Sequence, residues 1–87
     1  MSVDPYDVFI HEKLLTRSPR SGRQREQIML FVRSLVDNPY QEGDYQDTGP
    51  AGNRLYIKLI GDYAVSYHVD HPVKEVKIVN IQQSDQA

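Results

Sequence analysis

The side chains best suited to chemistry in this sequence are two cations and a histidine in its C-terminal half, Arg54, Lys58 and His68. Arginine and lysine stabilise negative charge that develops during a reaction. A histidine, with an unperturbed pKa near ~6.5, can accept or donate a proton at neutral pH. The simpler alternative is that Arg54 and Lys58 are solvated charges on a strand surface and that His68 is a half-exposed position beside a turn.

Motifs for bound cofactors are absent from the sequence. It contains no paired histidines at helical spacing, no paired carboxylates and no glycine-rich phosphate loop, so neither a metal ion nor a nucleotide cofactor is expected. It also contains no cysteine, which excludes disulfide bonds and cysteine-based zinc sites. Any chemistry would therefore rest on the side chains themselves, without a cofactor.

Charge is distributed unevenly along the chain, although the net charge is only −2. Residues 34–53 contain four acids and no base. Residues 13–33 contain one acid, Glu26, and six bases: Lys13, Arg17, Arg20, Arg23, Arg25 and Arg33. Such a basic stretch suits phosphates or an acidic protein segment. Because no aromatic residue is interleaved to stack on bases, an ordinary solvated surface is an equal alternative.

The 87 residues are expected to form one domain, residues 1–87. A chain this short buries only roughly 60–70% of the surface that it exposes when unfolded, yet 39% hydrophobic residues suffice for one core. The first ten residues include Asp4 and Asp7 and no basic run, unlike a signal peptide. No apolar stretch approaches the ~20 residues that span a bilayer. We therefore expect a small cytoplasmic protein with no membrane partner.

The N-terminal segment predicts a short strand. Tyr6, Val8 and Ile10 alternate with the residues between them, which suits residues 6–10 as a strand, followed by a helical turn at about residues 11–16. Asp4-Pro5 offers a competing signal, because an acidic N-cap followed by proline is also typical of a helix start.

Residues 22–37 predict the main helix. Ser21 and Gln24 have the spacing of a capping box, and Asn38-Pro39 stops the pattern, since proline disfavours helix at the residue before it. Between these signals, apolar residues repeat with helical spacing at Ile28, Phe31, Val32, Leu35 and Val36.

The C-terminal half predicts three strands, at residues 54–60, 63–69 and 73–81, separated by turns at Gly61-Asp62 and at residues 70–72. Residues 40–53 are polar and contain three glycines, which predicts a surface loop. The predicted fold class is α+β: a small β-α-α-β-β-β domain with a three- or four-stranded antiparallel sheet packed against one main helix plus a short one.

The length of the Gly61-Asp62 turn decides which candidate side chains meet. A two-residue turn places Lys58 opposite Val65, whereas a bulged or three-residue turn pairs Lys58 with Ser66 and Tyr56 with His68. The bulged register is the one that buries Leu55, Ile57 and Leu59, and we predict it for that reason. Arg54, Tyr56, Lys58 and His68 would then share one face of the sheet.

Several short motifs resemble, in their order and spacing, the RelE/ParE toxin superfamily. They are a helix ending in SLVDNP (residues 34–39), a strand pair with a Gly-Asp-Tyr hairpin, RLYIKLIGDYAVSYHVD (residues 54–70), and a last strand, KEVKIVNI (residues 74–81). No single motif is specific, but the resemblance covers about residues 6–83.

The resemblance implies the toxin of a two-gene toxin–antitoxin module, with an antitoxin protein as its partner. RelE-type members cleave messenger RNA on the ribosome, ParE-type members inhibit gyrase, and an extended antitoxin peptide neutralises either kind. On this basis Lys58, Arg54 and His68 are the candidate catalytic residues. The candidate RNA- or partner-binding residues are Arg17, Arg20, Arg23, Arg25 and Tyr56.

Three positions that such toxins commonly use for catalysis are filled differently here. The arginine that follows the Gly-Asp-Tyr motif is Ala64, the His-Arg pair of the last strand is Gln82-Gln83, and no tyrosine follows Tyr67. Cleavage needs a base for the 2′-hydroxyl, cations for the charge on phosphorus and an acid for the leaving oxygen.

Two hypotheses therefore stay open. One is a ribosome-dependent endoribonuclease; the other is a non-catalytic binding protein of the same fold, either a gyrase inhibitor or an inactive toxin homologue that only binds an antitoxin.

Overall fold

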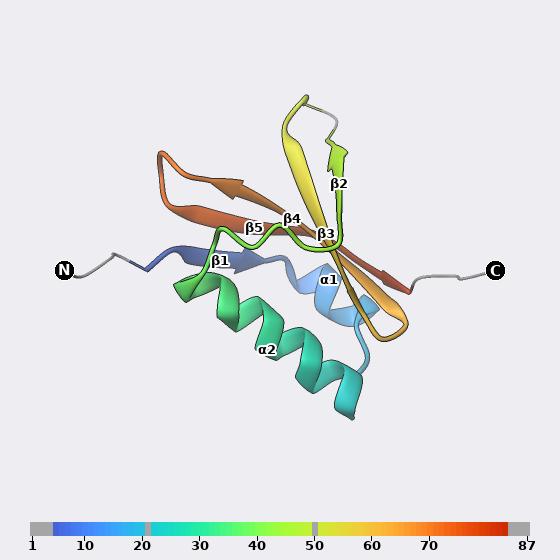
Figure 1. The fold of residues 1–87 in the computed structure, drawn as a ribbon. Coiled ribbons are helices and arrows are strands. Elements are labelled where there is room, and N and C mark those ends of the chain that lie inside the picture. Colours follow the sequence, from blue (N-terminus) through green and yellow to red (C-terminus); the bar gives the residue numbers. More distant parts are fainter. Residues whose placement is uncertain (1–4, 21, 50, 84–87) are drawn as a thin grey trace.

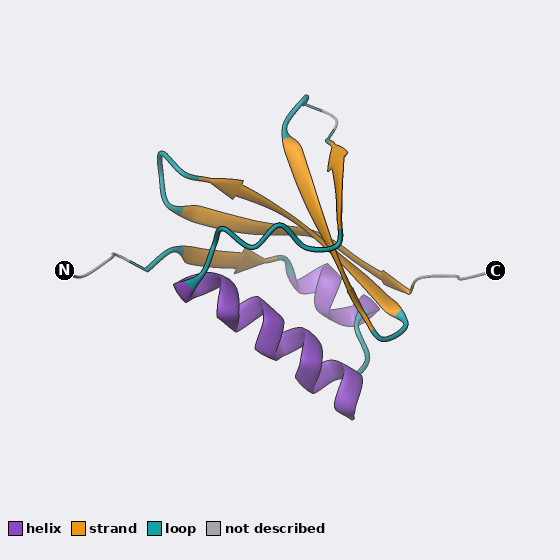
Figure 2. Ribbon diagram, in the orientation of Figure 1, coloured by secondary structure: helices purple, strands orange, loops and turns teal. Residues whose placement is uncertain are grey.

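The computed structural model describes residues 5–20, 22–49 and 51–83, and these residues form five strands and two helices. Both helices pack on one face of a five-stranded sheet (Figure 1, Figure 2). The predicted α+β class is confirmed. The elements are β1 (Asp7–Ile10), α1 (Glu12–Arg17), α2 (Arg23–Asp37), β2 (Tyr45–Thr48), β3 (Arg54–Ile60), β4 (Tyr63–Asp70) and β5 (Glu75–Gln83).

The main helix, α2, lies where its apolar spacing predicts it, and it ends before Asn38-Pro39 as expected. Its N-cap is Gly22, without a side-chain cap hydrogen bond. The predicted cap, Ser21, lies outside the described residues, and Gln24 instead donates a 3.2 Å hydrogen bond to the Asp62 carboxylate. In the described ranges, no helix is long and apolar enough to cross a membrane.

The first strand forms as predicted, in preference to the alternative helix, but its place in the sheet was not foreseen. β1 runs parallel to β5, with Asp7 opposite Glu75 and Ile10 opposite Ile78. A purely antiparallel sheet was expected. Because α1 and α2 intervene between β1 and the remaining strands, β1 can enter the sheet beside the last strand in the parallel sense.

The stretch predicted as a loop, residues 40–53, contains a strand. β2 pairs with β3 in the antiparallel sense, with Tyr45 opposite Ile57 and Thr48 opposite Arg54. All four of its residues are exposed, so no alternation of apolar side chains marks it in the sequence. The sheet order is β1-β5-β4-β3-β2, which makes β1 and β2 its edges.

The predicted register of β3 on β4 is wrong. Gly61-Asp62 forms a two-residue turn, so Lys58 lies opposite Val65 and Tyr56 opposite Tyr67. Gly61 adopts φ +58°, which suits glycine at the first position of the tight turns that fit the twist of a hairpin. The register shift that we expected in this hairpin occurs instead between β4 and β5, at Ser66/Tyr67.

This register exchanges the two faces of β3. We call the face that the helices cover the inner face and the opposite one the outer face. Val65, Tyr67 and Ile60 are buried on the inner face. Leu55, Ile57 and Leu59 therefore lie on the outer face, where they are only half-buried.

The core lies between the inner face and the two helices. Its centre is the contact of Phe31 with Tyr67, whose ring centroids are 5.5 Å apart. Every described element except β2 contributes apolar side chains to this core, and these fill the space that Leu55, Ile57 and Leu59 were expected to fill. The buried apolar residues are Tyr6, Leu14, Ile28, Phe31, Leu35, Ile60, Val65, Tyr67, Val76, Ile78 and Ile81.

Candidate functional site

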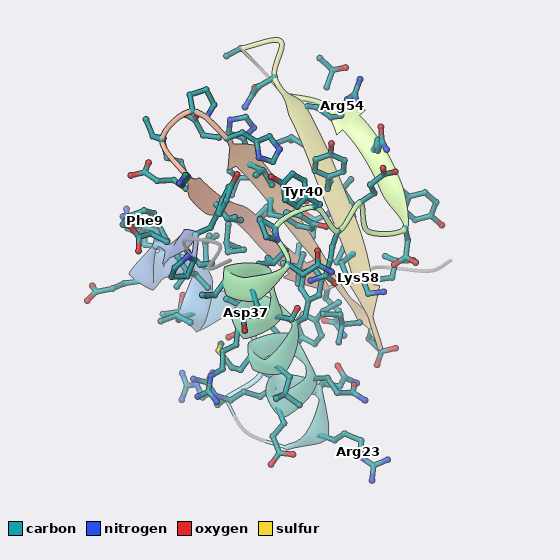
Figure 3. All side chains as sticks on the ribbon, turned by 60° about the vertical axis from the view of Figure 1, so that its left-hand side comes forward. Phe9, Arg23, Asp37, Tyr40, Arg54 and Lys58 are labelled. Carbon is teal, nitrogen blue, oxygen red and sulfur yellow. The ribbon has the colours of Figure 1, made fainter. Side chains whose placement is uncertain are left out.

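Alternation along β3 places three of the candidate side chains in one row on the inner face: Arg54, Tyr56 and Lys58. We call them the β3 row. Arg54 is exposed, and Tyr56 and Lys58 are half-buried. Figure 3 shows Lys58 near the level of Asp37, at the C-terminal end of α2, and Arg54 beyond that end of the helix. The row therefore leads from the helix onto a part of the sheet that α2 does not cover.

Lys58 lies beside an acidic side chain held by the preceding loop. Its Nζ is 3.8 Å from Oδ2 of Asp44, and each side chain keeps about two-fifths of its surface exposed, 38% and 42%. The same carboxylate oxygen accepts a 2.8 Å hydrogen bond from the backbone N–H of Leu59. An ion pair this exposed contributes only about 0–1 kcal/mol. Asp44 therefore partly neutralises Lys58 without removing it from solvent.

The loop that carries Asp44 is fixed closely to β3. The N–H of Asp44 donates to the carbonyl of Ile57 at 2.8 Å. Gly43 adopts φ +68°, and a Cβ at this position would lie 2.6 Å from the same carbonyl oxygen. Glycine is required for both reasons, and the acid beside Lys58 is a fixed feature of the site.

Tyr67 supports this loop from the core. Its hydroxyl donates a 2.6 Å hydrogen bond to the carbonyl of Gln41, and its ring lies 5.7 Å from that of Tyr56. Burial raises the pKa of Tyr67 to about 12, with further contributions from Tyr56, Asp44 and Glu42. The phenol therefore stays protonated at neutral pH, and it positions the loop rather than carrying protons.

The third candidate catalytic residue, His68, is not brought together with the other two. It lies on the outer face, where its Nδ1 is 3.3 Å from the backbone carbonyl oxygen of Arg54. The expectation of a shared face was wrong because it depended on the bulged register. Ser66 is also on the outer face, as are Ala64 and Gln82, which lie opposite each other on β4 and β5.

Sequence reasoning missed a cation that lies beside His68. Lys77 lies directly opposite His68 on the neighbouring strand, on the outer face. Lys77 and His68 are nine positions apart and belong to different strands, so only the β4–β5 register reveals that they are neighbours. The His68 imidazole and the Lys77 ammonium group thus lie side by side on the outer face, and the β3 row lies on the inner face.

The basic residues at the start of α2 lie far from the β3 row. Arg23 is in the first turn of α2, at the opposite end of the helix from Asp37 and Lys58 (Figure 3). Arg20 is exposed in the connection before it. Arg25 donates a 3.1 Å hydrogen bond to the carbonyl of Pro19, so it fastens that connection to the helix. The side chain of Arg17 lies outside the described part of the structure. The structure therefore separates Arg20 and Arg23 from the β3 row, which contains the remaining candidate binding residue, Tyr56.

The exposed side of α2 forms a shallow groove of about 400 Å³. Its lining is mostly apolar, and Leu30, one of its lining residues, is 63% exposed. Charged side chains border it. The lining residues are Arg25, Glu26, Met29, Leu30 and Arg33. Two of its three charged residues are basic, so the groove suits an apolar segment that has acidic residues beside it.

The described residues offer no place for a resident metal ion. Across residues 5–20, 22–49 and 51–83, no three histidine, aspartate or glutamate side chains gather as ligands.

Comparison with known proteins gives a match in structure but not in sequence. No protein-family model matches the chain, and no curated protein matches it significantly. The archaeal RelE–RelB complex from Pyrococcus horikoshii OT3 contains a chain with a TM-score of 0.74 and 24% identity, covering 95% of this chain and 99% of that one. The RelBE2 toxin–antitoxin complex of Mycobacterium tuberculosis contains another, with a TM-score of 0.68, 19% identity and coverage of 91% and 98%. Because the match extends over nearly the whole of each chain, this protein has the fold of the RelE toxins.

Proposed function

We propose that this protein is the toxin of a type II toxin–antitoxin pair and that it contacts messenger RNA on the ribosome through its β3 row. The observation that carries the RNA contact is the row itself. Arg54 and Lys58 are cations suited to phosphate oxygens, and Tyr56 between them is an aromatic ring suited to bases. The fold supports the toxin assignment, because the two similar chains were crystallised in a toxin–antitoxin complex and in a RelE–RelB complex.

A second function is favoured by the separation of the candidate catalytic groups. His68, the natural proton carrier, lies on the face opposite to Lys58, and the arginine and histidine positions of related toxins are Ala64 and Gln82 here. Both observations fit a binding protein without nuclease activity. Such a protein would act only by binding its target or an antitoxin.

One assay distinguishes the two functions. Purified protein is added to ribosomes programmed with a defined messenger RNA, and cleavage is followed by primer extension. Cleavage that requires the ribosome supports the endoribonuclease. If the messenger stays intact while the protein remains bound to the ribosome, the binding function is retained. If the protein neither binds nor cleaves, the RNA part of the proposal fails.

The antitoxin is expected to occupy the α2 groove. Its mostly apolar lining and bordering arginines match an amphipathic segment with acidic residues. Replacing Leu30 by aspartate puts a charge where an apolar anchor would bind. Truncation of such an anchor typically costs 2 kcal/mol or more, so we expect the affinity for the antitoxin to fall by roughly 30-fold or more. Calorimetric titration of the protein with the antitoxin encoded beside it measures this.

The matched control for that experiment is Gln27→Asp, which adds the same charge to an exposed position of α2 outside the groove. Gln27→Asp is expected to bind the antitoxin as the unmodified protein does. Equal loss in both variants would point to the overall charge of the helix, and no loss in either would show that the antitoxin binds elsewhere.

A further inference from the structure

An exposed aromatic cluster lies at one end of the sheet, outside the β3 row. It consists of Tyr6, Tyr40 and His71. The ring of Tyr40 is stacked on the imidazole of His71, with centroids 5.0 Å apart and planes inclined by 14°. Tyr6 meets both rings edge-on, and its hydroxyl lies 2.9 Å from Nδ1 of His71. Three segments far apart in the sequence thus hold the Tyr40–His71 stack in place.

The members of the cluster differ in exposure. Tyr6 is buried, with only 6% of its surface exposed, whereas Tyr40 is 67% exposed. Packing in the core explains why a tyrosine is present at position 6. Packing does not explain Tyr40 in the same way, because most of the surface of this residue is exposed to solvent. Tyr40 is therefore a fixed aromatic ring that is open to solvent on the side away from His71.

The cluster is connected to the β3 row through the loop that follows α2. Gln41, the residue after Tyr40, accepts the hydrogen bond of Tyr67, and Tyr67 lies opposite Tyr56 of the row. In Figure 3, Tyr40 lies between Asp37 and Arg54, beyond the end of α2. His71 is the first residue after β4, and its ring contacts Tyr6 of the core as well as Tyr40, so the stack lies at the end of the inner face. A strand of RNA on the β3 row can continue onto the stack.

We propose that the Tyr40–His71 stack binds one nucleobase of single-stranded RNA, with the base lying on the open face of the Tyr40 ring. This inference rests on the proposed RNA contact of the β3 row. Stacking on an aromatic ring is the general way in which proteins hold unpaired bases, and it tolerates any base because each has a π face. Since His71 and Tyr6 already fix the ring, little conformational freedom remains to be lost when the base binds.

The test is equilibrium binding of a short single-stranded RNA that contains 2-aminopurine. The protein has no tryptophan, so the emission of the base analogue can be followed directly. Affinity and quenching of the analogue are measured for Tyr40→Leu, which removes the aromatic ring, and for Tyr40→Phe, which keeps it. Tyr45→Leu is the control, because Tyr45 is an exposed tyrosine on β2 that lies opposite the outer-face residue Ile57.

Loss of one base–aromatic stack typically weakens binding by about 5- to 140-fold. We expect this loss, together with loss of quenching, for Tyr40→Leu. Tyr40→Phe and Tyr45→Leu should bind and quench as the unmodified protein does. His71→Ala should weaken both signals in part, because Tyr40 loses its support. Thermal unfolding of each variant verifies that its fold is intact.

Two negative results have different meanings. If Tyr40→Leu binds and quenches normally while Lys58→Met binds weakly, the stack is not part of the RNA site, and the proposed function stands. If the unmodified protein binds no RNA on its own or on the ribosome, the stacking site and the proposed RNA contact both fail.

Discussion

Lys58→Met is expected to lower the cleavage of ribosome-bound messenger RNA by about 10²–10³-fold, if the protein cleaves RNA at the β3 row. That is the usual cost of removing one group that stabilises charge developing in the transition state. Methionine retains an unbranched apolar chain of similar length but lacks the charge. Because Lys58 is half-exposed and its ion pair with Asp44 is weak, the fold should be preserved. Single-turnover cleavage on programmed ribosomes measures the effect.

Two further variants test whether cleavage of the messenger RNA takes place on the inner face. Asp44→Asn keeps an oxygen that can accept the hydrogen bond from Leu59 N–H but removes the negative charge beside Lys58, so RNA binding and cleavage should increase. His68→Ala changes only the outer face and should leave the rate unchanged. A positioned acid or base typically contributes about 10²–10⁴-fold. A loss of that size in His68→Ala, with no effect of Lys58→Met, would place the reaction on the outer face, beside Lys77.

Phe31→Ala is expected to lower the free energy of unfolding by ~3–5 kcal/mol, as truncation of a buried aromatic residue usually does. Phe31 is 9% exposed and contacts the ring of Tyr67 edge-on in the centre of the core. A domain of this kind is stable by only ~5–15 kcal/mol, so the variant should be close to unfolding at physiological temperature. Urea titration followed by circular dichroism measures the loss.

The matched control for Phe31→Ala is Leu30→Ala, the neighbouring apolar residue on the exposed side of the same helix. Leu30 is 63% exposed, and substitutions at exposed positions usually change stability by less than about 0.5 kcal/mol. Similar losses in both variants would mean that the helix as a whole, and not its buried face, determines the stability.

The main helix and the three C-terminal strands were predictable because their apolar residues repeat with the period of a helix or of a strand. Ile28, Phe31 and Leu35 repeat with a helical period and are buried, and Asn38-Pro39 stops the repeat. β2 could not be found in this way. Its four residues are all exposed, and what stabilises it is pairing with β3, which depends on contacts distant in the sequence.

The register of β3 on β4 was not predictable from burial, because both sides of β3 contain apolar side chains. Leu55, Ile57 and Leu59 alternate with Tyr56 and Ile60, so either side could have been the buried one. The turn residues indicate the correct register, because glycine at position 61 suits a two-residue hairpin. A shift of one residue exchanges the faces of a strand.

That shift of one residue explains which of the candidate residues share a face of the sheet. Arg54, Tyr56 and Lys58 are on one strand at a spacing of two, so they lie on one face in any register. His68 is on the neighbouring strand, so its face depended on the register. The neighbours Asp44 and Lys77 belong to other strands or loops, and only the folded chain brings them to Lys58 and His68.

The parallel pairing of β1 with β5 constrains how the chain reaches its native state during synthesis. Residues 7–10 leave the ribosome well before their hydrogen-bonding partners, residues 75–78, are made. Joining segments so distant requires closing a long loop, which is slow compared with forming local hairpins or helices. Until then, Val8 and Ile10 have no partner strand, and the nascent chain has an unprotected sheet edge at β5. A protein that binds the emerging chain early would therefore meet a molecule whose sheet is still incomplete.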